Sequence, residues 1–153
     1  MPKRRNSIEM SDAEIDAFLR GRHTMNVATI GPDGRIHLVA MWYGFLDGKP
    51  AFETYQKSQK VANLRRDSHI TVLIEDGDVY EELRGVELVG TGAVLDDRDH
   101  VMTVATSVVE RYMDVKPEDA AAAAEILANK RVAIAIDVER VVSWDHRKLG
   151  GTY

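Results

Sequence analysis

Residues 35–46 constrain the fold more than any other part of this chain, because they have the pattern of a β-strand that is apolar on both faces. Successive side chains of a strand point to opposite faces, and a strand with one face in water alternates apolar and polar residues. One face is expected to lie in the core. The other needs a cover: a partner subunit, a flat aromatic ligand, both together, or a helix of the same chain. The two sets are Ile36, Leu38, Ala40 and Trp42, and His37, Val39, Met41, Tyr43 and Phe45.

Further strand-like runs, separated by turn signals, occupy most of the remaining chain. Gly-Pro-Asp-Gly at residues 31–34 and Asp-Gly-Lys at 47–49 are typical turn sequences. The internal glycines Gly85, Gly90 and Gly92 indicate bulges or bends, and sequential antiparallel strands with such glycines favour a closed barrel. The fold is therefore predicted to be mainly β with helices. The predicted strands are 24–30, 35–46, 50–56, 69–75, 80–95, 131–138 and 141–145, and the predicted helices are 12–20, 58–67, 97–115 and 117–130.

Length and composition indicate one globular domain and exclude several kinds of site. The chain has 153 residues, of which 44% are hydrophobic and 29% charged. We expect a flexible basic tail over residues 1–10 and a single domain over residues 11–153. The net charge of -5 argues against general nucleic-acid binding. The absence of cysteine excludes disulfides, thiol catalysis and iron–sulfur clusters.

The distribution of apolar residues gives no indication of a membrane or secreted protein. No stretch approaches the roughly 18 apolar residues that a membrane-spanning helix needs. The basic N-terminus is not followed by the apolar run of a signal peptide. We expect no membrane contact and a cytoplasmic location.

A basic cluster at a predicted strand-to-helix junction is the clearest candidate for a binding site. Ser58, Gln59 and Lys60 fall in the turn, with Lys57 before it and Arg65 and Arg66 one to two turns later. Free backbone amides at a helix start, together with lysines and a hydroxyl, suit a phosphate group. The cluster stands out because the chain as a whole is acidic. The alternative is an amphipathic helix whose charges simply face water.

Candidate proton donors and metal ligands are scattered. His37, Tyr43, Tyr55 and His69 could donate a proton to a reduced substrate, but each fits a packing or surface role better. No spacing brings three ligands together, so no metal site is predicted. The catalytic residues, if any, stay unassigned.

Several motifs together resemble the split-barrel flavin and deazaflavin oxidoreductases. These include the pyridoxamine phosphate oxidase-like proteins and the coenzyme F-420-dependent reductases of actinobacteria. The motifs are Asp-Gly-Arg-x-His-Leu-Val-x-Met-Trp-Tyr at 33–43, Phe-Glu-Thr at 52–54, Ser-x-Lys at 58–60, Asn-Leu-Arg-Arg-Asp at 63–67, and the runs at 82–90 and 142–151.

The resemblance implies a six-stranded antiparallel split β-barrel (the FMN-binding split barrel) that forms a homodimer, with the cofactor in a groove between subunits. It also implies cofactor-binding roles by position. The strand that meets the ring system carries Val39, Ala40 and Met41, and a second strand places Thr54 beside the cofactor. The phosphate-binding turn consists of Lys57, Ser58, Gln59 and Lys60, and the helix after it carries Asn63 and Arg65, which reach a phosphate or a glutamate tail. The aromatic residue that comes from the partner chain is Trp144.

Departures from the family pattern narrow the expected function. Ala40 stands where many relatives have proline, and Gly85 stands where the classical oxidases carry a ring-binding amide. Vitamin B6 oxidation is therefore disfavoured. The expected activity is hydride transfer from reduced coenzyme F-420, whose phosphate continues into a lactyl-polyglutamate tail, to an unsaturated or conjugated small molecule. An FMN-dependent enzyme of the same fold, or a non-catalytic flavin-, deazaflavin- or haem-binding protein, is the alternative.

Overall fold

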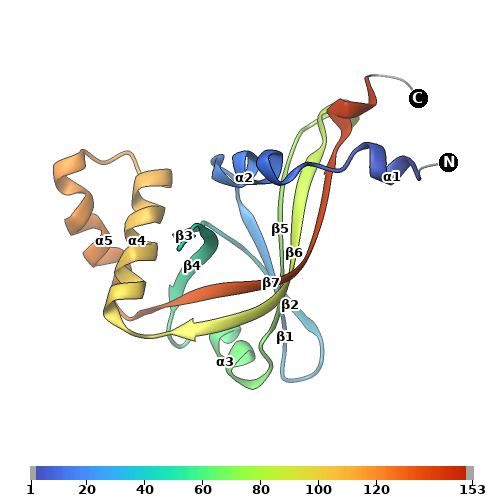
Figure 1. Ribbon diagram of the computed structural model, residues 1–153. Helices are drawn as coiled ribbons and strands as arrows, with labels where there is room; N and C mark the ends of the chain where they lie inside the picture. The colour runs from blue at the N-terminus through green and yellow to red at the C-terminus, as the bar shows by residue number, and fades with distance from the viewer. Residues whose placement is uncertain (1–2, 151–153) are drawn as a thin grey trace.

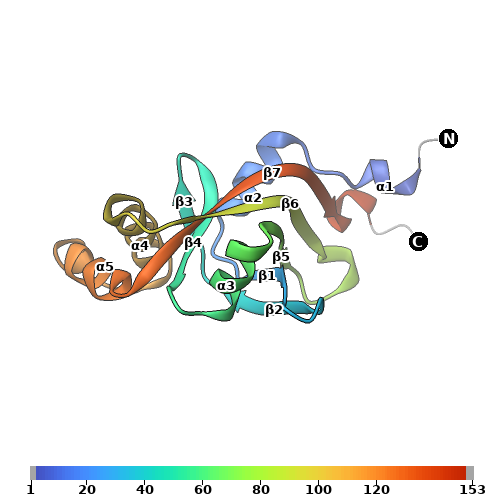
Figure 2. The ribbon, with the colours of Figure 1, turned by 90° about the horizontal axis from the view of Figure 1, so that it is seen from below.

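The computed structural model describes residues 3–150, and its centre is one antiparallel sheet of seven strands that curls on itself (Figure 1 and Figure 2). The strand order is β2-β1-β5-β6-β7-β4-β3. The predicted class, mainly β with helices, is confirmed. The strands are β1 Met25–Ile30, β2 Ile36–Met41, β3 Gly44–Leu46, β4 Lys49–Tyr55, β5 His69–Asp76, β6 Arg84–Leu95 and β7 Arg131–Asp145.

The six strands that the family resemblance implies are wrong, because the sheet has seven. The strands predicted from the residue pattern differ from the observed ones in two places, and the first is the stretch 35–46. It breaks at Trp42 and Tyr43 into two strands, which lie at opposite ends of the strand order. The Tyr43 side chain is fully buried there and its hydroxyl donates to the Leu19 carbonyl, so the chain turns inward at this point. A second difference is that the two strands predicted over residues 131–145 form one long strand, β7.

The predicted glycine bulge is present in the longest strand pair. The register between β6 and β7 shifts between Val89 and Gly90. A Cβ atom on Gly90 would lie 1.9 Å from the backbone oxygen of Asp137, closer than atoms can approach. Only glycine therefore fits where the two strands bend together.

The helices cover the two ends of the curled sheet. α2 begins with a capping box, in which Ser11 and Glu14 satisfy each other's backbone amides. α4 and α5 pack together at the other end, as Figure 1 shows, and α3 follows β4. None of the described helices is both long and apolar enough to cross a membrane. The helices are α1 Arg4–Ser7, α2 Asp12–Arg20, α3 Gln59–Arg66, α4 Arg98–Tyr112 and α5 Ala120–Ala128, with 3₁₀ turns at Tyr80–Glu82, Pro117–Asp119 and His146–Leu149.

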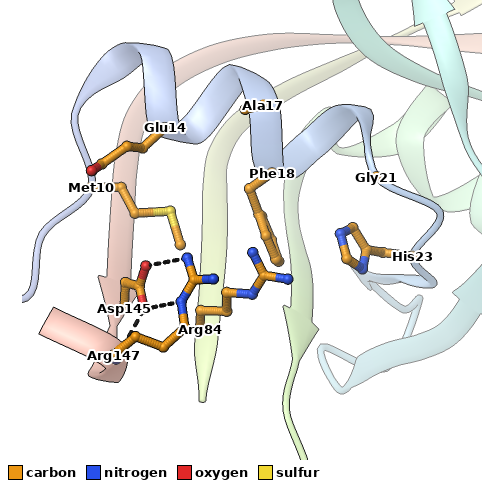
Figure 3. Close-up of a pocket in the computed structure, with 9 residues that line it drawn as sticks. All are labelled: Met10, Glu14, Ala17, Phe18, Gly21, His23, Arg84, Asp145 and Arg147. Carbon is orange, nitrogen blue, oxygen red and sulfur yellow. Dashed lines mark hydrogen bonds and ion pairs between the residues drawn. The ribbon is translucent and has the colours of Figure 1, made fainter. Parts of the chain in front are cut away.

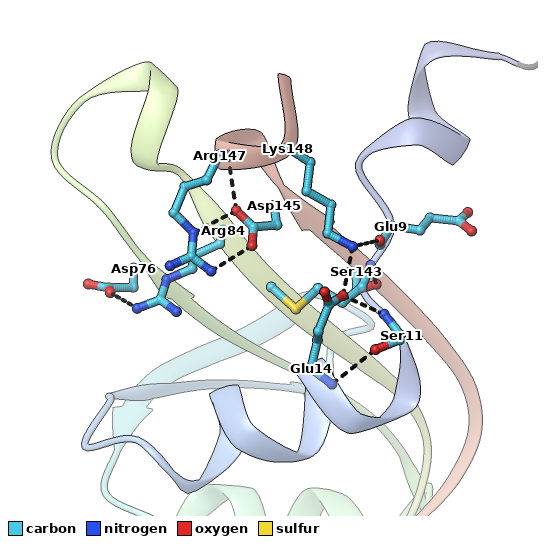
Figure 4. A network of polar contacts seen from close by, with 10 residues as sticks. Glu9, Ser11, Glu14, Asp76, Arg84, Ser143, Asp145, Arg147 and Lys148 are labelled. Carbon is cyan, nitrogen blue, oxygen red and sulfur yellow. Dashed lines mark hydrogen bonds and ion pairs between the residues drawn. The ribbon is translucent and has the colours of Figure 1, made fainter. Parts of the chain in front are cut away.

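The segment before α2 contacts the end of β7 (Figure 4). The backbone amide of Met10 donates to Ser143 Oγ over 3.0 Å, and the amide of Asp145 donates to the Ile8 carbonyl over 2.7 Å. Lys148 Nζ lies 2.7 Å from Glu14 Oε2. Residues 8–10 of the expected flexible tail thus lie against the sheet, while residues 1 and 2 lie outside the described part. The domain boundary at residue 11 stays a prediction.

Replacing Asp145 with asparagine tests how much these contacts contribute to stability. The Asp145 side chain is buried, and the Arg147 guanidinium donates to it over 2.7 and 2.9 Å. These hydrogen bonds hold the pKa of Asp145 below its ordinary value of 3.8. Because Arg147 is half exposed, we expect Asp145→Asn to lower the free energy of unfolding by only about 1 kcal/mol at pH 7.

The lowered pKa of Asp145 predicts how the loss of stability in Asp145→Asn depends on pH. A lowered pKa in the folded state stabilises the fold above the ordinary pKa, and this contribution is lost as pH falls below it. Urea denaturation of both proteins at pH 7 and pH 3 should therefore give a difference at pH 7 that shrinks at pH 3. A difference that is the same at both pH values would contradict the assignment.

The two faces of β2 differ in exposure, and one apolar face is uncovered in the protomer. The covered face carries Val39 and Met41, which are half-buried and pair in register with Val27 and Met25. The opposite face carries Ile36 and Leu38, which are 70% and 67% exposed. The alternative that a helix of the same chain covers this face is therefore wrong.

Candidate functional site

A cavity of about 470 Å³ lies at the end of β2 and brings several distant segments together. Ala40 and Met41, both expected beside the cofactor ring, line it. The ring of Trp42 stacks on Tyr112 with ring centroids 5.1 Å apart. The full lining is Thr24, Ala40, Met41, Trp42, Glu53, Leu127 and Arg131.

The predicted phosphate turn forms the start of α3. Ser58 is the N-cap residue, with φ -70° and ψ 156°, yet its side chain makes no capping hydrogen bond. Its Oγ is buried and has no hydrogen-bond partner in the described part of the chain. A buried hydroxyl without a partner costs free energy, so the position suits a ligand that would complete it. The helix start and its dipole favour an anion as that ligand.

Lys60, in the first turn of α3, is buried and not exposed as its charge suggests. The residue is 8% exposed, and its ammonium makes no hydrogen bond or ion pair within residues 3–150. Burial lowers its pKa, and the charge of Arg131 adds to this effect while Glu53 opposes it. Partial desolvation of a lysine cation costs free energy, which an anion bound beside it would offset.

Two charged residues of the cavity wall were missed from the sequence. Glu53 on β4 is 5% exposed, and its Oε2 lies 3.1 Å from Arg131 Nη1 on β7. Burial raises the pKa of Glu53, and Arg131 and Lys60 oppose this. The sequence signal was available, since Glu53 is a charged residue inside a strand that is otherwise mostly apolar.

His37 is a third residue whose role only the structure reveals. Its ring Nδ1 is buried and lacks a hydrogen-bond partner among the described residues, as does Ser58 Oγ. His37 lies directly opposite Thr29 of β1, and Thr29 Oγ1 accepts from Asn63 Nδ2 of α3 over 3.0 Å. This histidine therefore lies on the side of the sheet that holds α3.

Asn63 anchors α3 through its side-chain amide. It is fully buried; besides its bond to Thr29, its Oδ1 accepts from Gln59 Nε2 over 2.8 Å. Arg66 also donates to the backbone, at the carbonyl of Ile30. Both residues hold the helix against β1. We therefore leave Asn63 out of the proposed ligand contacts, whereas Lys57 and Arg65 are exposed beside the turn.

Three further predicted residues lie away from the cavity within one protomer. Thr54 is buried and points to the opposite face of β4 from Glu53, because strand side chains alternate. Val39 faces the core. Trp144 lies at the far end of β7 from Arg131 and packs over Gly85. Trp144 can join the site only if a partner chain presents it.

A second cavity, of about 290 Å³, lies between α2 and the ends of β6 and β7 (Figure 3). Its arginines already have carboxylate partners: Arg84 lies 2.9 Å from Asp76, and Arg147 lies 2.7 Å from Asp145. These cations are neutralised, so this cavity is the weaker candidate. No group of three or more metal-ligating side chains occurs within the part of the chain that the structure describes.

Comparison with solved structures places this chain among known folds. A conserved hypothetical protein, Rv2991 from Mycobacterium tuberculosis, is 45% identical, with a TM-score of 0.91 over 99% of this chain and 94% of that one. An F420 reductase is 23% identical, with a TM-score of 0.61 over 82% and 94% of the two chains. HutZ, the haem storage protein from Vibrio cholerae, is 12% identical, with a TM-score of 0.66 over 86% and 94%. The last two likenesses show the fold alone.

The sequence matches a known family over most of its length. Among curated proteins, no sequence matches the chain. The profile of the family described as Pyridoxamine 5'-phosphate oxidase, however, matches residues 11–145. The chain therefore belongs to the pyridoxamine 5'-phosphate oxidase family.

Proposed function

We propose that this protein is an oxidoreductase that uses reduced coenzyme F-420 to deliver hydride to an unsaturated or conjugated small molecule. The observation that carries the proposal is the buried, unpartnered Ser58 Oγ at the start of α3, two residues before Lys60, whose side chain is largely buried. A phosphate is the anion that satisfies both groups at a helix start. The donor set therefore fits a phosphate-bearing cofactor.

The residues present would divide the binding between two parts of the site. The first amides of α3, Ser58 and Lys60 would hold the phosphate, and His37 could donate from its free ring nitrogen. The cavity beside Ala40 and Met41 would hold the ring. When bound, the reduced deazaflavin ring supplies the hydride. The protein's part is to bind the ring, orient it and exclude water.

A homodimer would complete this site. Trp144 cannot reach the cavity from its own protomer, and the exposed face of Ile36 and Leu38 offers an apolar surface for a second copy. We propose that the partner chain covers this face and brings its Trp144 end toward the cofactor.

Preference for F-420 over FMN is expected, and it should depend on salt. Lys57 and Arg65 are exposed cations beside the phosphate turn. They suit the carboxylates of the F-420 tail, which FMN lacks. Each exposed cation should add only about 0.2–1 kcal/mol, and salt screens it. We expect F-420 to bind more tightly than FMN at low ionic strength, by a margin that shrinks at high ionic strength.

Isothermal titration of both cofactors at two salt concentrations tests this preference. Tighter binding of FMN under both conditions would replace the deazaflavin proposal with the FMN alternative, which the phosphate turn alone supports equally. Substrate-dependent oxidation of reduced F-420, followed by its absorbance, separates an enzyme from a cofactor-storing protein. A Soret band in the purified protein would favour a haem-binding role instead.

A further inference from the structure

We infer that Arg131, held in place by Glu53, binds the polar end of the substrate and makes the site selective for uncharged conjugated carbonyl compounds over carboxylates. The inference rests on the proposed function, because it assumes that the cofactor ring lies beside Ala40 and Met41. It names the class of substrate that the remaining part of the same cavity would accept.

The cavity of about 470 Å³ is lined from two separate parts of the fold. The strands β2 and β4, which both contribute to it, are not neighbours in the sheet. A ring that lies along β2 would therefore leave the other wall to a second molecule. Hydride transfer requires the reacting atoms to approach within about 3–3.5 Å, so the substrate must share this cavity with the ring. The β2 wall consists of Ala40, Met41 and Trp42, and the Arg131 wall consists of Glu53 on β4, Leu127 on α5 and Arg131 on β7.

Arg131 is the hydrogen-bond donor that its wall offers to a substrate. Its side chain is 35% exposed, and its Nη1 lies 3.1 Å from Oε2 of Glu53, whose own side chain is only 7% exposed. A guanidinium carries five N–H donors, so this ion pair leaves others for a ligand. Glu53 lies directly opposite Ala133, two residues after Arg131, so both charged side chains project from the same face of paired strands. The paired strands restrict where the guanidinium can lie.

The charge of Glu53 decides which acceptor this guanidinium prefers. The carboxylate cancels the positive charge of Arg131, so the pair offers N–H donors without net charge. An uncharged carbonyl oxygen can accept such a hydrogen bond without adding charge to the cavity. A carboxylate ligand would leave a surplus negative charge close to Glu53, and a like charge at short range disfavours the ionised form. The other lining side chains are apolar or aromatic apart from the hydroxyl of Thr24, so they offer no further cation.

The same contact suits the reduction of a conjugated carbonyl compound. When hydride adds to the carbon β to the carbonyl, the electron pair of the C=C bond moves toward the carbonyl oxygen, which gains negative charge. An N–H donor of Arg131 stabilises that charge as it develops. A proton from water then adds to the carbon α to the carbonyl, and the product is the saturated compound.

Titration of matched probes into protein saturated with oxidised F-420 measures the selectivity without turnover, because the oxidised ring has no hydride to donate. Methyl cinnamate is an uncharged conjugated ester, and cinnamate is the carboxylate of the same skeleton. Measurement at pH 8 keeps cinnamate ionised, and it keeps Glu53 ionised because Arg131 and Lys60 counteract the effect of burial on its pKa. Isothermal titration should show methyl cinnamate binding about three- to tenfold more tightly than cinnamate, a modest factor because Arg131 is partly exposed.

Glu53→Gln removes the charge and keeps the shape of the side chain. Cinnamate should then gain about three- to tenfold in affinity, while methyl cinnamate changes by less than about twofold. Comparing the change in each probe cancels any effect of the extra methyl group. In the double variant Glu53→Gln, Arg131→Met the gain of cinnamate should disappear, because the cation is gone. Glu110→Gln, at an exposed position of α4, is the matched control for net charge and should change neither affinity.

The outcomes separate this inference from the proposed function. The wild-type comparison needs no variant, so equal or tighter binding of the carboxylate, or no detectable binding of the ester, would overturn the inference even if Glu53→Gln fails to fold. An equal gain for both probes in Glu53→Gln, or a gain that survives in the double variant, would overturn it as well. Displacement of F-420 by the ester would show that ring and substrate do not occupy separate walls, while the deazaflavin proposal would stand. If FMN is the cofactor that binds, the deazaflavin proposal fails, and the same titrations of FMN-loaded protein decide the role of Arg131.

Discussion

Replacing Lys60 with methionine is expected to weaken F-420 binding by about 1.5–3 kcal/mol, the range for hydrogen bonds to charged groups, or roughly ten- to a hundred-fold. Methionine keeps most of the buried aliphatic part of the side chain and removes the ammonium, so a loss of affinity reports on the missing charge. Isothermal titration at low salt measures the change. Unchanged affinity would remove Lys60 from the phosphate site.

The same substitution should not destabilise the free protein. The Lys60 side chain is largely buried and makes no ion pair among the described residues, and burial lowers its pKa, so desolvation of the charged form opposes folding without a ligand. We expect the melting temperature of cofactor-free Lys60→Met to equal or exceed that of the wild type. Lys57→Met, at an exposed position of the same turn, is the matched control and should change affinity far less.

An aspartate at position 38 should convert a dimer into a monomer. Leu38 is 67% exposed and Ile36 is 70% exposed on the uncovered face of β2. We expect this face to lie in an interface near the roughly 1,600 Å² total of a standard-size complex. A carboxylate buried there without a partner would cost several kcal/mol. Sedimentation of wild type and Leu38→Asp at micromolar concentration measures the change.

Ile126→Asp is the matched control for this experiment. Ile126 is 78% exposed on α5, so Ile126→Asp replaces an exposed aliphatic side chain with a carboxylate at a site away from β2. It should leave the dimer intact. A monomeric wild type, or dissociation by both variants alike, would refute the placement of the interface.

The position of the anion site could be predicted from the sequence because its chemistry is local. Ser58, Gln59 and Lys60 are consecutive, and a strand, a polar turn and a helix define the geometry of their backbone amides. No distant contact is needed to place a helix start after a strand. The burial of Lys60 could not be predicted in the same way, because it depends on the packing of α3 against β1 and β6, which lie elsewhere in the chain.

The boundaries of the strands show where local patterns fail. Residues 35–46 alternate as one strand would, and nothing local marks the break at Tyr43. The break arises because Tyr43 is buried with its hydroxyl on the Leu19 carbonyl, a contact made by a segment that precedes it by more than 20 residues. Long-range contacts of this kind leave no periodic signal.

The sequence by itself determined the class of fold, the glycine bulge at Gly90, the apolar face that needs a cover, and the turn at Ser58–Lys60, because each depends on side-chain alternation or on neighbouring residues. Only the tertiary structure decided that Glu53 and Arg131 meet, that the Lys60 side chain is largely buried, and that Asn63 donates to Thr29. Those features depend on which strands pair and on which charged side chains become buried. Contacts between segments far apart in the chain determine both.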